Sequence, residues 1–164
     1  MLQFTVLAAA LATAVVIDVR TRRIPNWLTG ALAAGGFGMA FGGGVVTPAQ
    51  AAFGVLAGLL LMMPGHLIGA TGAGDVKLMA AVGAVVGPGM VLRAFLFTAV
   101  VGGLFAIAVA VRRGRLAETV YGTTQLVTSP VSSRPTINST DRANRFAYGP
   151  AIAVGTLLSF MVTL

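Results

Sequence analysis

The stretch Leu2–Arg23 reads LQFTVLAAALATAVVIDVRTRR, an apolar run that ends at Asp18 and is followed by a cluster of arginines. A helix needs about 20 largely apolar residues to cross a bilayer, and this run approaches that length. A secretory signal peptide carries its basic residues before its apolar core, whereas here they follow it. The stretch therefore predicts a membrane span that stays in the mature protein.

The composition of the whole chain extends this prediction. Hydrophobic residues make up 57% of the 164 residues and charged residues only 9%, whereas a soluble domain carries roughly a quarter charged residues. The chain holds no cysteine, which excludes disulfides, thiolate metal sites and cysteine nucleophiles. Its net charge of +7 comes from residues between apolar runs, so we attribute the charge to membrane topology and expect no nucleic acid partner.

Further apolar segments predict an all-α, polytopic membrane protein with about six transmembrane helices in a single domain over residues 1–164. We find no alternation typical of strands, and lipid cannot satisfy the backbone of an open sheet. The fourth segment is short, and glycines make the far end of the second uncertain. The one sizeable polar stretch, at about 112–145, predicts a flexible cytoplasmic loop. The predicted spans are 2–18, 27–46, 50–69, 74–88, 90–111 and 146–164.

The basic residues orient these spans. Ten of the eleven lie in segments that fall on one side of a six-span chain, and only Arg93 falls on the other. Because basic loops stay in the cytoplasm, both termini are predicted to lie outside. We therefore expect a multi-pass protein of a cytoplasmic (inner) membrane, in contact with lipid.

Two of the four acidic residues, Asp18 and Asp75, adjoin apolar runs at the cytoplasmic ends of predicted spans, whereas Glu118 and Asp141 lie in the polar loop. A carboxylate at membrane depth is costly and suggests a functional site. Each acid also has a structural alternative. Asp18 could pair with a neighbouring arginine, and Asp75 could be the N-cap of the fourth span.

Two carboxylates in one site of low dielectric can hydrolyse an amide without a metal or a covalent nucleophile. Like charges a few ångströms apart cannot both ionise, so one carboxyl keeps its proton. The ionised carboxylate can then activate a water while the protonated one polarises the scissile carbonyl. Asp18 and Asp75 are therefore candidate catalytic residues, and the pair titrates as one unit.

The residues around each acid fit this hypothesis. Gly72 and Gly74 flank the approach to Asp75 in the sequence Gly72–Lys77, GAGDVK, and glycine allows positive φ and the close approach of another backbone. Lys77 could tune the acid pair, or its side chain could extend to the interface.

Downstream of Asp18 the chain reads Ile24, Pro25 and Asn26. Proline suits the first turn of a helix, so Pro25 is expected to open the second span. We expect Ile24, Pro25 and Asn26, like the GAGDVK glycines, to support the site or the approach of the substrate.

This pairing of Asp18 and the Ile24–Asn26 tripeptide with the Gly72–Lys77 motif resembles the prepilin peptidases, the bacterial branch of the GxGD intramembrane aspartyl peptidases. Phe146–Ala151 is similar to the closing motif of that family. The resemblance implies that Asp18 and Asp75 are catalytic. It also implies removal of the leader from type IV prepilin and pseudopilin precursors at the cytoplasmic face, without a metal or other cofactor.

Larger members of this family also methylate the new N-terminus, using an added domain with paired cysteines. The present chain has no cysteine and is most similar to the short, methyltransferase-lacking members of tight-adherence (Flp) pilus systems. We therefore expect peptidase activity alone.

Three other functions use intramembrane acids. A small ion-coupled transporter would hold them nearer the membrane midplane. An assembly or anchor subunit would pair them with arginines of a partner. A metal-dependent membrane transferase would use them as ligands, although two carboxylates make a thin metal site.

Overall fold

The computed structural model describes residues 2–112 and 148–162, and all regular structure in these ranges is helical. The predicted all-α class is confirmed, and each predicted span has a helix at its place in the chain. The predicted loop at 112–145 lies outside the described residues except for Arg112, the last residue of α5. The helices are α1 (Leu2–Thr21), α2 (Asn26–Phe41), α3 (Pro48–Leu67), α4 (Ala73–Val86), α5 (Pro88–Arg112) and α8 (Gly149–Met161).

Three helices of the described ranges are long and apolar enough to cross a membrane, over 3–21, 48–67 and 88–109. The others are shorter, with 16 residues in α2, 14 in α4 and 13 in α8. The chain is thus an all-helical membrane protein. The crossing of the bilayer by all six helices stays a prediction.

Local signals set the helix ends. Arg22 adopts a left-handed conformation, with φ of 52°, and its N–H donates to the carbonyl of Asp18, which ends α1 as an αL residue commonly does. The second helix ends at Phe41, earlier than predicted, because Gly43 turns the chain with a φ of 81°. Thr47 and Gln50 form a reciprocal capping box that starts α3.

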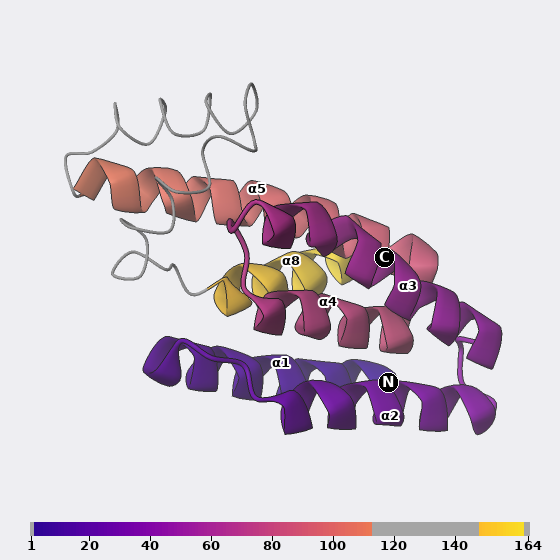
Figure 1. Ribbon diagram of the computed structural model, residues 1–164. Coiled ribbons are helices and arrows are strands. Elements are labelled where there is room, and N and C mark those ends of the chain that lie inside the picture. Colours follow the sequence, from indigo (N-terminus) through magenta and orange to yellow (C-terminus); the bar gives the residue numbers. More distant parts are fainter. Residues whose placement is uncertain (1, 113–147, 163–164) are drawn as a thin grey trace.

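Figure 1 shows the helices as a bundle in which α4 lies between α3 and the α1–α2 pair. Extensive contacts join α4 to α3 and to α2, and join α5 to α8. The end of α1 and the starts of α2, α4 and α8 lie at one end of this bundle, which we call the motif end. The start of α1 and the end of α8 lie at the opposite end, in agreement with the prediction that both termini are on one side.

Small residues let α3 and α4 approach closely. Gly54 faces Gly83, and a Cβ added to either glycine would overlap the backbone of the other helix. A Cβ on Gly58 would lie 2.6 Å from the carbonyl oxygen of Met79. This packing holds α4 firmly, and most of its residues are buried.

Candidate active site

Asp18 lies in the last turn of α1 and is only 5% exposed. Its Oδ2 accepts a hydrogen bond of 2.9 Å from the backbone N–H of Gly149, the first residue of α8. A Cβ on Gly149 would lie 2.7 Å from that same oxygen, so only glycine fits here. Within the described part of the chain, Asp18 forms no ion pair with Arg20 or Arg22, in contrast to the structural alternative for this acid.

Asp75 is the third residue of α4 and is 9% exposed. Its Oδ2 accepts a hydrogen bond of 2.9 Å from the N–H of Gly72. Gly72 itself is the N-cap residue, so the alternative that Asp75 occupies that position is wrong. The carboxylate nevertheless satisfies a backbone donor that the helix leaves unpaired, and the positive end of the helix dipole favours its charge.

The helix α8 packs against both helices that carry the acids, α1 with Asp18 and α4 with Asp75. Tyr148 immediately precedes Gly149, the donor to Asp18. The ring of Tyr148 in turn lies against Gly102 of α5, where a Cβ would meet the phenol oxygen at 2.7 Å. The two acids are therefore separated by 57 positions in sequence but are carried by helices that both contact α8.

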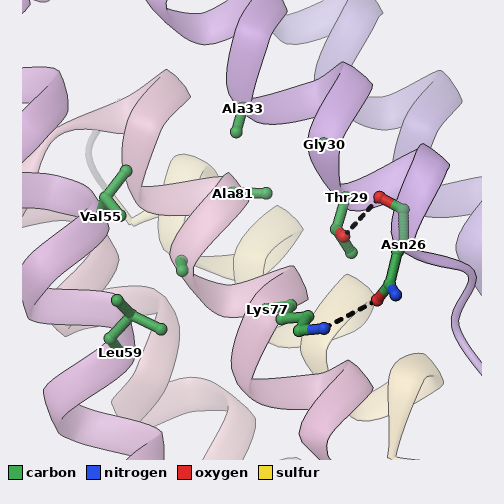
Figure 2. A pocket seen from close by; sticks show the side chains of 9 residues that line it. Asn26, Thr29, Gly30, Ala33, Val55, Leu59, Lys77 and Ala81 are labelled. Carbon is green, nitrogen blue, oxygen red and sulfur yellow. Dashed lines mark hydrogen bonds between the residues drawn. The ribbon is translucent and has the colours of Figure 1, made fainter.

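The two sequence motifs also contact each other directly. A Cβ on Gly74 would lie 3.1 Å from Cβ of Ile24, so the loop before α2 packs on the first turn of α4. Lys77 Nζ donates a 2.8 Å hydrogen bond to Asn26 Oδ1, and Thr29 Oγ1 donates to the Asn26 carbonyl, as Figure 2 shows. These contacts hold the segment that follows Asp18 against the segment that carries Asp75.

The structure shows how the glycines of the GAGDVK motif are used. Glycine would permit positive φ at Gly72 and Gly74, but in residues 2–112 and 148–162 the glycines with positive φ are Gly43, Gly69 and Gly87, and Gly72 has a φ of −79°. The space beside Gly74 is filled by Ile24 and is not open to a substrate backbone.

Pro25 was expected in the first turn of α2 and is instead its N-cap residue, with an extended ψ of 142°. This conformation lets the chain turn from α1 into α2 before the helix begins.

Tyr148 and Gly149 belong to the closing motif Phe146–Ala151, but neither was assigned a role at the site from the sequence. The hydrogen bond between Asp18 and Gly149 joins positions 131 residues apart, which no local pattern encodes. The available signal was the Gly149–Pro150 pair at the start of the last apolar segment, since proline in the first turn marks a helix start.

The site offers acid and base groups. In the described ranges no three side chains of His, Cys, Asp or Glu gather as a metal would require. His66 instead contacts the carbonyl of Thr71 through Nδ1 at 3.2 Å, which requires a proton on that nitrogen, and so ties the end of α3 to the loop before Gly72. Two buried carboxylates at one end of a bundle can exchange protons with a water and a peptide.

Comparison with known proteins places this geometry in context. A model of the type IV leader peptidase family matches residues 5–107. The match contains both aspartates and both motifs and ends within α5, so α8 lies beyond it. Comparisons with curated proteins and with solved structures found no match.

Proposed function

Because the chain belongs to the type IV leader peptidase family, a family of aspartic-type prepilin peptidases, we propose that Asp18 and Asp75 are its catalytic pair. The observation that carries this proposal is that both carboxylates are buried at the motif end of the bundle (Figure 1). Asp18 accepts the Gly149 N–H, and Asp75 lies in the first turn of α4, which contacts both α1 and α8. Two buried acids on helices that pack against one another are well suited to share a water and a proton.

The proposed reaction is hydrolysis of one peptide bond. The ionised carboxylate takes a proton from water as the water oxygen attacks the scissile carbonyl carbon, and the protonated carboxyl gives its proton to the carbonyl oxygen. The second carboxylate then takes a proton back from one hydroxyl of the tetrahedral intermediate as that intermediate collapses, the C–N bond breaks, and the leaving amine takes a proton from the first carboxyl. The pair returns to its starting state with one proton, as coupled acids do.

The other residues of the two motifs hold the acid-bearing segments in place and do not react themselves. Ile24 against Gly74, with Asn26 bonded to Lys77, fixes the loop after α1 to the start of α4. Pro25 restricts the backbone of that loop, and Gly72 donates to Asp75. These contacts hold two catalytic groups that come from different helices, and small errors in such geometry slow reactions strongly.

The finer parts of the proposal concern substrate and compartment. The substrates are the precursors of Flp-type pilins and pseudopilins, cut at the cytoplasmic face of the inner membrane, with the motif end of the bundle in the cytoplasm. Arg20 and Arg112 lie in the last turns of α1 and α5, and Arg22 and Arg23 follow α1, so these basic residues gather at the motif end as the positive-inside rule favours for a cytoplasmic face. We propose no N-methylation, because the 164 residues contain no cysteine for the paired-cysteine domain of the larger members.

The test is co-expression with an Flp-type prepilin, with leader removal followed by gel shift and the new N-terminus by mass spectrometry. Asp18→Asn and Asp75→Asn are compared with Asp141→Asn, the same substitution in the polar loop. We expect cleavage to be lost in the first two variants and retained in the third, with an unmethylated product.

Two results would contradict this proposal. Cleavage retained by Asp18→Asn or Asp75→Asn would remove that residue from the catalytic pair. Cleavage that stops on chelation and returns with a divalent cation would favour metal chemistry. A reporter fused near Arg115 tests the orientation separately, and an external signal would overturn the cytoplasmic position of the motif end.

A further inference from the structure

An open pocket of about 450 Å³ lies between α2 and α3, with α4 as its floor. Figure 2 shows Gly30 and Ala33 on the α2 side and Val55 and Leu59 on the α3 side. Apart from Thr29, Asn26 and Lys77, its lining is apolar and mostly small. Lys77 and its partner Asn26 lie at one end, so the pocket begins at the motif end of the bundle.

Gly30 is a glycine that the packing of the described residues does not require. A Cβ at Gly30 would have no atom within 4 Å, whereas one at Gly36, Gly54 or Gly83 would meet the backbone of a neighbouring helix. Glycine weakens a helix interior. The small size of Gly30 therefore leaves the α2 side of the pocket open.

The dimensions of the pocket suit a helix. Its α2 side runs from Asn26 to Ala33, and seven steps of about 1.5 Å span about 10 Å, or two helical turns. Small residues such as Gly30 let a second helix approach closely in lipid. A pocket side that is about two turns long and carries a small residue therefore suits a packed helix better than a mobile acyl chain.

The polar end of the pocket lies at the same end of α4 as the candidate active site. Lys77 lines the pocket and lies two residues after Asp75 on α4, and Asn26 is the first residue of α2, after the loop that follows Asp18. Residues two apart point to different sides of a helix. A chain leaving the pocket at this end therefore reaches the acids by crossing the first turn of α4, where Ala73 is exposed.

We propose that this pocket binds the first turns of the apolar helix of the prepilin, with the scissile peptide beyond its Lys77 end. The inference rests on the proposed function and adds to it the place where the substrate helix docks. The leader before that helix then crosses the start of α4 toward Asp75 and Asp18.

The absence of cysteine from the chain allows a direct test with single cysteines. Gly30→Cys is compared with Gly103→Cys, a matched control in α5 whose Cβ also has open space around it. Each is incubated, with copper phenanthroline as the oxidant, with a prepilin that carries one cysteine in the first turns of its apolar helix. We expect a disulfide at Gly30→Cys and none at Gly103→Cys, and competition by excess cysteine-free prepilin.

A kinetic arm uses Gly30→Leu and Gly103→Leu. Filling the pocket should raise KM for the full prepilin by about tenfold with little change in kcat, because ground-state and transition-state binding are lost together. Gly103→Leu should leave both values unchanged. A short leader peptide without the apolar helix should be cut equally by both variants and the parent, which shows that the acid pair is intact.

Three results would overturn the docking inference while the parent chain still cleaves prepilin. They are equal cross-linking at both positions, an unchanged KM in Gly30→Leu, and labelling of Gly30→Cys by a thiol-reactive phospholipid that excess prepilin does not displace. The last would assign the pocket to lipid. Failure of the parent chain to cleave any prepilin would instead contradict the proposed function itself.

Discussion

The first turn of α4 carries polar contacts, whereas the turns that follow carry close backbone packing. In the first turn, Asp75 accepts the N–H of Gly72, and Lys77 at its end reaches Asn26 of α2. Further along, Gly83 lies against Gly54 of α3, and Ala84 lies against Gly36 of α2. One short helix thus presents Asp75, a proposed catalytic residue, at its start and is held in place by the rest of its length.

Glycine has a different task in each region. Gly74 makes room for the side chain of Ile24, and Gly72 supplies a backbone donor. Gly54 and Gly83 instead let two backbones meet, so a side chain at either position has no space to move into. Substitutions in the first region should therefore alter activity, and those in the second should alter folding.

The largest expected effect comes from Asp75, where two substitutions separate its proposed acid–base role from its hydrogen bond to the Gly72 N–H. Asp75→Asn keeps an acceptor for the Gly72 N–H but cannot act as acid or base, so cleavage should fall by about 10³-fold or more with an unchanged melting temperature in detergent. Asp75→Ala should lose as much activity and also about 1 kcal/mol of stability, because the N–H loses its partner. Equal melting temperatures for the two variants would show that the hydrogen bond does not stabilise α4.

The next effect is on folding. Gly83→Val places a branched side chain against the backbone of Gly54, and the resulting separation of α3 from α4 should destabilise the protein by about 3 kcal/mol or more. Thermal unfolding in detergent measures this loss. Gly103→Val, the same change at an open position of α5, is the control and should lower the melting temperature little. Similar losses in both would mean that helix propensity, and not packing, sets the effect.

The sequence predicts a feature of α4 and its neighbours well when that feature depends on residues close together in the chain, and poorly when it depends on residues far apart. Apolar runs encode helices locally, so the order of the six segments and the shortness of the fourth were predictable. The pattern Gly72–Asp75 marked an unusual turn but could not say whether its glycines serve conformation or packing. Packing against Ile24 depends on a partner 50 positions away, and the contact of Asp18 with Gly149 spans 131 positions.

That long-range contact gives the third prediction. Gly149→Ala places a methyl group 2.7 Å from Asp18 Oδ2, so the carboxyl must move, and cleavage should fall by about 10- to 100-fold. Gly155→Ala, in the same helix, would press instead on Thr98 of α5. It should lower the melting temperature more than the activity per folded molecule. If Gly149→Ala cleaves as well as the parent, the position of Asp18 relative to α8 is not important for catalysis.

The smallest expected effect concerns the bond between the two motifs. Lys77→Met keeps the apolar stem but removes the donor to Asn26. It should reduce cleavage a few-fold and stability by about 1 kcal/mol, the net value of an ordinary hydrogen bond.

A double-mutant cycle with Asn26→Leu isolates this contact, since the two changes should be less than additive by about 0.5 kcal/mol or more if they act on one bond. Full additivity would mean that Lys77 and Asn26 act separately. The structure gives a reason to expect coupling: with Ile24 fixed on Gly74, the Lys77–Asn26 bond is the second point that ties the loop after Asp18 to α4. Two points define the direction of that loop, whereas one would leave it free to rotate. Loss of the second point should therefore affect the acid pair more than it affects the stability of the bundle.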